Sequence, residues 1–511
     1  MRIQKHLKSA CFWLLLLFIG IVLFSRAARK PFWFDEFVTL AIAQSRFGPE
    51  MWQAGSAGFD FNPPAIFVAT RLSEMAFGRG PVSSRLPSIL SGLIVLFCAF
   101  KVSSRGGGAA AGFGVLFLLC FSGAFIYFTE ARGYALVMAG VMIAWVSWQD
   151  RVYNASHRPL QLLGIFLGLT LALASHMWAI VVPGCFLASA IAHWLRNKTL
   201  DVGAVGAMIA PGMVVLSYLP LVAGTRGILL GGEIFKESLN DAYALALTHV
   251  PHLLFVFALI FAAHALFFQR NLDNESSQPR SALTPEDTVL ALCLVCAPVA
   301  IYAITKLMHS AFFPRYALVA ALGLTVLLAQ LFSYFAQRAR TTCYAVLFVL
   351  GLGLSAYSIR SVTQSWNAPN PLGPELSSLS QVGGTNEPVI YCSGLDFMQA
   401  DYYATPEMAA RLLYVADRQI ARRIIGTDGV DAVYTLGRDY LKLRGRVVSY
   451  PELESTYRSF WLVGDSLNPF NWIGEKLRED GADIRALNIP NTRIFHVTLS
   501  KSGRVERGNI P

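Results

Sequence analysis

The feature that most constrains the fold of this chain is a series of long apolar runs before residue 360. A helix needs about 20 mostly apolar residues to cross a bilayer, because the lipid core offers no water to backbone N–H and C=O groups. Only 14% of the residues are charged, against roughly a quarter in soluble domains. Eleven runs meet this requirement: 11–24, 86–102, 109–128, 133–149, 160–175, 177–195, 203–222, 250–268, 287–305, 315–335 and 342–358. We therefore predict a polytopic α-helical membrane protein of about eleven transmembrane helices.

The composition changes to that of a globular domain after about residue 360. Short apolar runs that suit strands alternate there with amphipathic stretches such as Phe470–Glu479. The candidate strands are Val389–Tyr391, Val430–Tyr434, Phe460–Val463 and Phe495–Leu499. This alternation predicts a small α/β domain. We expect a transmembrane domain over residues 1–359 and an α/β domain over residues 360–511.

Basic residues predict which loops face the cytoplasm. If the N-terminus is inside, every inner loop carries a basic pair, as the positive-inside rule requires. These pairs are Lys101 and Arg105, Arg151 and Arg158, Arg196 and Lys198, Arg270 and Arg280, and Arg338 and Arg340. Residues 26, 29, 30, 71, 79 and 85 are basic on the outer side, against the rule. We expect a long outer loop at 29–85 and an outer C-terminal domain.

The formal net charge of +10 raises the question of nucleic acid. Lys and Arg are scattered over short loops and form no basic stripe with interleaved aromatic residues, which is the pattern of nucleic-acid binding. The lipid bilayer is therefore the expected partner, and nucleic acid is not.

The first outer loop opens with two adjacent carboxylates, Asp35 and Glu36, that follow Pro31-Phe32-Trp33-Phe34. One interpretation is helix capping, because a carboxylate at the start of a juxtamembrane helix running to Ser45 satisfies its free N–H groups. The other interpretation is catalytic. Charged residues at a membrane surface are functional candidates, and the sequence leaves both interpretations open.

A second group of polar residues lies near the outer ends of the predicted spans. Glu130 and Arg132 share one short turn, for which the alternative to a functional role is a local ion pair. For a long cation near a span end, the alternative is that it simply reaches the membrane surface. His176, His249 and His252 are further candidates to face the same cavity, with an ordinary interfacial histidine as the alternative.

The order of these motifs resembles glycosyltransferase family 39, which includes the protein O-mannosyltransferases and the lipid A aminoarabinose transferase. The resemblance covers roughly residues 10–330 and departs from the family pattern at Asn62, where a histidine is usual. The matching motifs are Asp35-Glu36, Asn62-Pro63-Pro64, Arg85-Leu86-Pro87, Glu130-Ala131-Arg132-Gly133-Tyr134, Ser175-His176 and Pro314-Arg315-Tyr316. It implies the GT-C fold and an enzyme of the bacterial inner membrane, with its active site and C-terminal domain facing the periplasm.

The resemblance also implies transfer of a sugar from a polyprenyl-phosphate donor to an envelope acceptor, which is a lipid such as lipid A, a glycan or a protein hydroxyl. Such a donor is already activated, so the enzyme mainly needs a base and cations that hold phosphate. Asp35 is the expected base, and Glu36 is expected to orient it or to help bind the acceptor. Arg132 and Arg315 are the first candidates to clamp the phosphate, because guanidinium binds phosphate bidentately. Further candidates for substrate binding are Glu130, Lys306, Arg85, Asn62 and His176.

No cofactor is required by this chemistry, and direct displacement would invert the anomeric carbon. Asp35 and Glu36 can hold a divalent ion through oxygen ligands, so the sequence leaves metal use open. The main alternative function is a transporter or flippase, and a third is a non-catalytic scaffold for envelope assembly. Transporters often show internal repeats and broken helices at the midplane, and neither is evident here.

Overall fold

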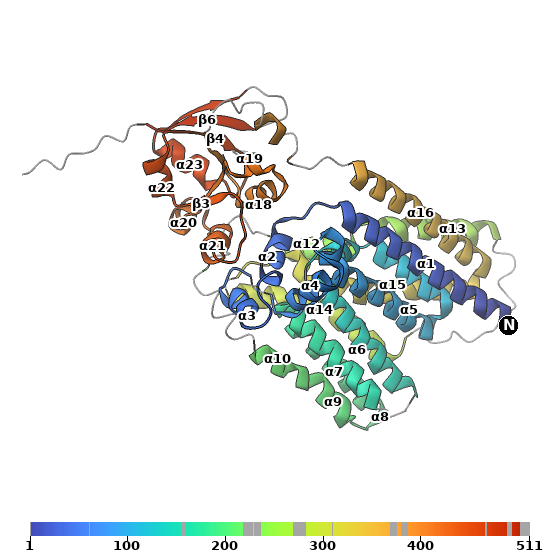
Figure 1. Ribbon diagram of the computed structural model, residues 1–511. Helices are drawn as coiled ribbons and strands as arrows, with labels where there is room; N and C mark the ends of the chain where they lie inside the picture. Colours follow the sequence, from blue (N-terminus) through green and yellow to red (C-terminus); the bar gives the residue numbers. More distant parts are fainter. Residues whose placement is uncertain are drawn as a thin grey trace, which may run out of the picture.

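A helical bundle and a smaller sheet domain make up this protein, seen here in a computed structural model. In Figure 1 the sheet domain lies beside one end of the bundle, near α2, and the N-terminus lies at the other end. The structure describes residues 2–60, 62–154, 159–217, 228, 237–268, 283–308, 310–367, 372, 376–379, 387–464, 468–487 and 493–500.

The eleven predicted apolar runs are mostly helical over their described residues, with short breaks such as residues 121–122 and 318. The elements fall into three groups. The long helices are α1 (Arg2–Arg29), α5 (Pro81–Cys120), α6 (Tyr134–Asn154), α7 (Pro159–Ser175), α8 (Val182–Asn197), α13 (Val250–Phe268), α14 (Pro285–Leu307), α15 (Val319–Arg338) and α16 (Arg340–Asn367). The shorter helices are α9 (Val202–Ile209), α10 (Met213–Leu216) and α12 (Leu239–Leu247). The 3-10 turns are η1 (Gly123–Thr129), η2 (Met177–Val181), η3 (Ala210–Gly212) and η6 (Pro314–Ala317).

The described residues contain six helices that are long and apolar enough to span a membrane, or eight if two bent pairs each form one span. The difference from eleven arises at three places. α5 contains two predicted runs, divided at Gly108, whose φ of 67° interrupts the helix. α7 and the segment Val202–Leu216 are apolar but shorter than the spanning helices. The count of eleven therefore stays a prediction, whereas a polytopic helical membrane domain is confirmed.

The loops gather at two opposite ends of the bundle, because α6, α8, α14 and α15 each run from one group of loops to the other, whereas α5 turns back at Gly108, so that Phe100 and Phe113 of its two halves are in contact. At the predicted inner end, basic residues are paired with acids. Arg105 pairs with Asp150, Arg151 with Asp201, and Arg196 with Glu286. At the opposite end lie residues 33–36, 130–134, 176–178 and 313–316, which line or adjoin one cavity. The residues that carry the family resemblance therefore share one end of the bundle.

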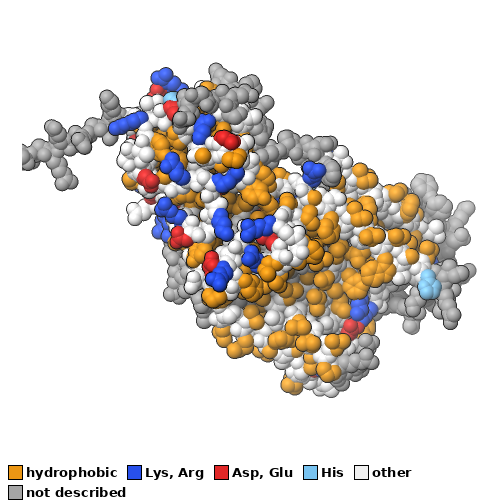
Figure 2. All heavy atoms as spheres, viewed as in Figure 1, with side chains coloured by type: hydrophobic (Ala, Val, Ile, Leu, Met, Phe, Trp, Pro, Cys, Tyr) orange, Lys and Arg blue, Asp and Glu red, His pale blue; other side chains and the backbone are white. Residues whose placement is uncertain are grey.

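Three helices follow α1 at this end, which the sequence predicts to be the outer one: α2 (Phe34–Ala43), α3 (Pro49–Ser56) and α4 (Ala65–Phe77). The prediction of a helix that starts at the acid pair and runs toward Ser45 is thus close to α2. Figure 2 shows hydrophobic side chains spread over the bundle, while Lys and Arg gather on the sheet domain and where it meets the bundle. This distribution fits a bundle in lipid with a domain outside it.

The C-terminal domain contains one six-stranded sheet in the order β3-β2-β1-β4-β6-β5. Neighbours among β3, β2, β1 and β4 pair in parallel, whereas β6 is antiparallel to both β4 and β5. The strands are β1 (Val389–Tyr391), β2 (Leu412–Val415), β3 (Arg446–Val448), β4 (Ser459–Val463), β5 (Asp483–Ala486) and β6 (Ile494–Thr498). The helices are α18 (Gly394–Tyr403), α19 (Pro406–Ala409), α20 (Arg418–Ile425), α21 (Gly429–Leu436), α22 (Tyr450–Thr456) and α23 (Trp472–Glu479).

One predicted strand of this domain is wrong, because Val430–Tyr434 belongs to α21. Its apolar residues Val430, Val433 and Tyr434 are spaced three and four apart, which places them on one helix face. The other three predicted strands correspond to β1, β4 and β6, and the amphipathic stretch Phe470–Glu479 contains α23. The α/β domain itself is confirmed, and the preceding helix α16 continues to Asn367, beyond the predicted boundary at 359.

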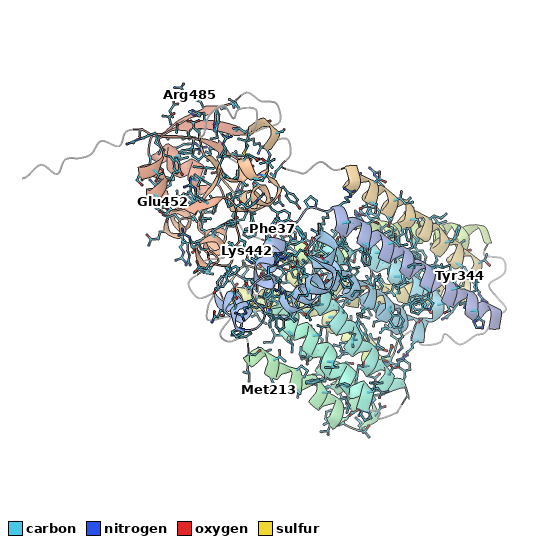
Figure 3. The ribbon with its side chains drawn as sticks, viewed as in Figure 1. Phe37, Met213, Tyr344, Lys442, Glu452 and Arg485 are labelled. Atoms are coloured by element: carbon cyan, nitrogen blue, oxygen red, sulfur yellow. The ribbon has the colours of Figure 1, made fainter. Side chains whose placement is uncertain are left out.

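A hydrophobic core joins this domain to the outer helices. Phe32, Phe34 and Phe37 belong to the same buried cluster as Phe397 and Tyr434. The rings of Phe37 and Tyr402 have centroids 5.1 Å apart, and Figure 3 shows Phe37 where the bundle meets the domain. Burial of aromatic surface on both sides holds the domain over the outer end of the bundle.

Candidate active site

A cavity of about 410 Å³ lies between the outer end of the bundle and the C-terminal domain. The bundle side supplies both arginines and two aspartates of its lining, and the domain supplies mostly apolar residues together with Asp396 and Gln399. The residues that line the cavity include Trp33, Asp35, Asp60, Asn62, Arg132, Tyr134, His176, Trp178, Arg315, Tyr316, Leu395, Asp396, Gln399, Val430, Val433 and Phe470. Concave, largely apolar cavities with a few convergent polar groups are typical of substrate sites.

Asp35 lies in the first turn of α2 and lines this cavity. Its Oδ2 atom is 3.2 Å from a terminal nitrogen of Arg315 and 4.0 Å from one of Arg132. The side chain is 18% exposed, so it can be reached from the cavity. These contacts keep a carboxylate beside two guanidinium groups without fully enclosing it.

Glu36 is turned away from the cavity and forms a buried ion pair with Arg85. Arg85 Nε and Nη2 donate to Glu36 Oε1 and Oε2, both over 2.7 Å, and both side chains are 0% exposed. Glu36 also accepts hydrogen bonds from the backbone N–H groups of Trp33 and Ala131. Capping of α2 is therefore a function of Glu36 and not of Asp35. Neither Glu36 nor Arg85 lines the cavity. The two charges neutralise each other in the buried ion pair.

Arg132 connects the turn before α6 to the outer loop. Its Nη1 donates to Asp60 Oδ2 over 2.9 Å, and to Asp35 O and Thr39 Oγ1 over 3.0 Å each. Asn62 donates from its backbone N and from Nδ2 to Asp60 Oδ1. Asp60 thus holds Arg132 and Asn62 together at the cavity wall.

Arg315 is the less constrained of the two arginines at the cavity. It lies in η6, and its guanidinium packs over the rings of Phe313 and Trp33, at 4.6 Å and 5.4 Å from their centroids. The side chain is 25% exposed, against 8% for Arg132. Aromatic faces can hold a guanidinium in place while leaving its N–H donors free for phosphate.

His176 lies between the two arginines and two tyrosines. Its Nδ1 accepts a hydrogen bond from the N–H of Trp178, and its ring contacts those of Tyr134 and Tyr316. Burial, together with the charges of Arg132 and Arg315, lowers the pKa of His176 to about 3. The imidazole is therefore neutral at physiological pH and adds no third positive charge.

A glycine allows the turn that carries Arg132 to approach His176. A Cβ atom on Gly133 would lie 2.2 Å from the backbone oxygen of Ser175. Any other residue would push the turn away from the end of α7. The Arg-Gly-Tyr sequence therefore brings Arg132 and Tyr134 against the Ser175-His176 pair.

The other predicted site residues lie outside the cavity lining. Glu130 does not pair with Arg132 but with Lys30, whose Nζ is 2.6 Å from Glu130 Oε1. Lys306 is exposed, with its Nζ 5.1 Å from the Tyr302 ring centroid. His249 and His252 pack near each other and also lie outside the lining. The structure thus brings together Asp35, Asn62, Arg132, His176 and Arg315.

Several buried polar atoms at the cavity have no hydrogen-bond partner among the described residues. They are Trp33 Nε1, Arg132 Nε and Arg315 Nε. Unpaired buried polar groups are costly, and native proteins contain few of them. These three atoms belong to residues that line the cavity, where a polar ligand could complete their hydrogen bonding.

The two adjacent carboxylates do not form a joint metal site in this structure. Glu36 is directed to Arg85, whereas Asp35 is directed to Arg315. Within the described ranges, no group of three or more His, Cys, Asp or Glu side chains is placed to hold a metal ion. A cation beside Asp35 would also lie close to two guanidinium groups, which would repel it.

Sequence reasoning missed several lining residues. Three of them are close in sequence to predicted site residues: Asp60 to Asn62, Tyr134 to Arg132 and Tyr316 to Arg315. This closeness in sequence could have identified them as candidates. Asp396, Gln399 and Phe470 come from the C-terminal domain. No motif marks these three residues, and only the docking of the domain brings them to the cavity.

A helical membrane domain followed by a small sheet domain is a fold that solved structures also show. The sequence matches no protein-family model, and no curated protein matches it significantly. Its structure is similar to that of ArnT from Cupriavidus metallidurans in the apo state, with a TM-score of 0.55 and 14% identity over 96% of this chain and 98% of that chain. ArnT from the same organism bound to undecaprenyl phosphate aligns over the same shares, with a TM-score of 0.54 and 13% identity.

An oligosaccharyltransferase from Archaeoglobus fulgidus, in complex with Zn and sulfate, is more distant. It aligns with a TM-score of 0.42 and 11% identity, over 88% of this chain and 68% of that chain. The two ArnT structures, with TM-scores above 0.5, establish the fold alone at this sequence identity, and the reaction has to be argued from the site.

Proposed function

We propose that this protein is a membrane glycosyltransferase that transfers a sugar from a polyprenyl-phosphate donor to an envelope acceptor hydroxyl. The observation that supports this most strongly is the position of Asp35, which lines the cavity beside Arg315 and Arg132. A carboxylate next to two phosphate-binding groups matches the needs of this reaction. The site further lies where an outer-face enzyme of the bacterial inner membrane would meet a lipid-linked substrate.

In the proposed reaction, Asp35 takes the proton of the acceptor hydroxyl as its oxygen attacks the anomeric carbon. The bond between that carbon and the phosphate oxygen breaks, and polyprenyl phosphate leaves with the electron pair. Attack opposite the leaving group inverts the anomeric configuration. The charge that develops on phosphate is stabilised by arginine, which is most effective in a site shielded from water.

The donor class is supported by two features. Arg315 has unpaired N–H capacity at the cavity, and guanidinium binds phosphate through two parallel hydrogen bonds. ArnT from Cupriavidus metallidurans, which shares the fold, binds undecaprenyl phosphate. A polyprenyl chain would remain in the lipid while its phosphate reaches the outer end of the bundle. The proposal requires no metal, because the leaving group is already a phosphate.

Arg315→Ala should weaken binding of undecaprenyl phosphate by about ten- to a hundredfold, since a hydrogen bond to a charged group contributes about 1.5–3 kcal/mol. Arg315→Lys should restore only part of the affinity, because lysine lacks the planar fork. Binding of labelled undecaprenyl phosphate to the purified protein in nanodiscs measures this. Arg132→Ala should weaken undecaprenyl phosphate binding less than Arg315→Ala does. It should also loosen the segment around Asp60, because Arg132 donates a hydrogen bond to the Asp60 carboxylate.

Arg338→Ala provides the matched control. Arg338 also packs over an aromatic ring, that of Tyr334, but it lies at the opposite end of α15. Its replacement should leave undecaprenyl phosphate binding unchanged. Equal affinity in wild type and Arg315→Ala would remove Arg315 from the donor site.

The proposed periplasmic orientation makes a separate prediction about topology. Alkaline phosphatase is active only outside the cytoplasm, so a fusion after Asn367, at the end of α16, should be active. A fusion after Arg151, among the paired charges of the predicted inner end, should be inactive. The reverse pattern would place the cavity on the cytoplasmic face and exclude the outer-face reaction.

A transporter or flippase remains the alternative, and the cavity distinguishes the two. A transporter needs a pathway through the bundle, with its site near the midplane. Here the charged residues gather at one end and a separate domain covers them. Sugar transfer by the purified protein, with donor and acceptor on the same side, would support the enzyme. Movement of labelled lipid without transfer would support the alternative.

A further inference from the structure

The C-terminal domain forms one wall of the cavity, and this wall differs chemically from the one opposite. α18 supplies Leu395, Asp396 and Gln399, while α21 supplies Val430 and Val433. The bundle wall carries both arginines of the lining. The domain wall carries one carboxylate, one amide and apolar surface. A substrate with two unlike parts could therefore lie with one part against each wall.

α18 is held in a fixed position relative to Asp35. The backbone N–H of Phe32 donates to Tyr403 Oη over 2.8 Å, and Gln399 Nε2 donates to Phe32 O over 3.1 Å. Both backbone groups of Phe32, three residues before Asp35, are thus bound by one helix of the domain. These two hydrogen bonds keep the face of α18 that carries Asp396 opposite the first turn of α2.

Asp396 is also placed to receive a ligand. It forms no ion pair with any described residue, and burial raises its pKa above the ordinary value of an aspartate. Hydrogen-bond donors stabilise the charged form of a partly buried carboxylate that has no ion-pair partner. Neighbouring hydroxyl groups of a sugar ring can supply two at once.

The charges of the described lining argue against a phosphate on this side. The lining holds three aspartates, Asp35, Asp60 and Asp396, against two arginines. In the proposed reaction the donor phosphate occupies the arginines. A second phosphate on the acceptor would then meet the negative charge of Asp396 and no free cation of the described lining, and like charges repel.

From these observations we infer that Asp396 and the adjoining face of α18 form the acceptor subsite, and that it takes a polyhydroxylated carbohydrate and not a phosphate group. This inference rests on the proposed glycosyltransferase function. It goes further by naming the acceptor chemistry and the domain that selects it. Leu395, Val430 and Phe470 supply the apolar surface on which a sugar ring can pack.

A binding experiment tests the subsite without requiring turnover. Purified full-length protein in nanodiscs is saturated with undecaprenyl phosphate and dialysed against labelled maltotriose or labelled glucose 1-phosphate. Maltotriose should be retained and glucose 1-phosphate should not. Asp396→Asn should weaken maltotriose binding about tenfold, because a charge-assisted contact becomes a neutral one. Asp396→Lys should favour glucose 1-phosphate instead.

Asp483→Asn is the matched control. Asp483 is an exposed aspartate on β5, paired with Arg485, and Figure 3 places Arg485 on the side of the domain away from the bundle. This variant should bind both probes like the wild type. Preference for glucose 1-phosphate in the wild type, or equal maltotriose binding in Asp396→Asn, would overturn the inference.

A kinetic experiment separates failure of this inference from failure of the proposed function. Polyprenyl-phosphate sugars extracted from membranes, labelled in the sugar, are supplied with maltotriose as the acceptor probe. Asp396→Asn should raise the acceptor KM about tenfold and leave undecaprenyl phosphate affinity unchanged. Asp35-dependent transfer to a phosphate-bearing acceptor would overturn the acceptor assignment alone. Absence of any Asp35-dependent donor consumption would count against the proposed function and against the inference that rests on it.

Discussion

Asp35→Asn should fold and bind donor normally yet transfer sugar at least about a hundred times more slowly, because a positioned base contributes about 10²- to 10⁴-fold. Asparagine has nearly the size of aspartate but cannot take a proton from the acceptor. Capping does not complicate this variant, since the side chain that accepts from the Trp33 N–H belongs to Glu36. Single-turnover transfer by purified protein measures the effect.

Asp241→Asn is the control for this measurement. Asp241 also lies in the first turn of a helix, α12, where it accepts hydrogen bonds from Ser238 at the surface. Its replacement should leave transfer near the wild-type rate. Undiminished transfer by Asp35→Asn would remove Asp35 as the base. The stereochemistry of the product gives an independent check, because direct displacement predicts inversion.

Glu36→Ala should lower the free energy of unfolding by about 3–5 kcal/mol, the range for removing one partner of a buried ion pair. The variant leaves the Arg85 guanidinium uncompensated in a fully buried position. It also removes the acceptor for the N–H of Ala131, which connects the first outer loop to the turn before α6. Denaturant unfolding of the purified protein in detergent measures this loss.

Glu50→Ala is the matched control, because Glu50 is an exposed glutamate in the first turn of the neighbouring helix α3. It should change the free energy of unfolding by less than about 0.5 kcal/mol. A Glu36→Ala protein as stable as the wild type, but with greatly reduced transfer, would reverse the roles assigned to Asp35 and Glu36.

The opposite roles of these two residues could not be read from their adjacency. Successive residues on a helix point about 100° apart, so one of two neighbouring carboxylates can face a cavity while the other faces the interior. Which one does so depends on where Arg85 lies, and Arg85 is 49 positions from Glu36. The sequence alone therefore left catalysis and capping open for this pair, and the structure gives the capping contact to Glu36 and places Asp35 at the cavity.

The same reasoning applies to the candidate cations. Arg85, Arg132, Lys306 and Arg315 all lie near span ends in the sequence, where a long cation can either bind substrate or reach the membrane surface. The local sequence cannot distinguish a cation that binds substrate from one that reaches the membrane surface, because the distinction depends on which residue the cation contacts in the folded protein. Arg85 forms a buried ion pair with Glu36, and Lys306 is exposed. Arg315 instead pairs with Asp35 at the cavity.

By itself the sequence determined that this is a polytopic helical membrane protein with a following α/β domain, because hydrophobic length and periodicity are local properties of the chain. It also placed the polar motifs at one end of the helices. Only the tertiary structure decided which members of those motifs meet, and that α18 of the C-terminal domain completes the cavity with Asp396 and Gln399. These contacts join residues hundreds of positions apart, such as Phe32 and Tyr403, and they depend on packing that no local pattern records.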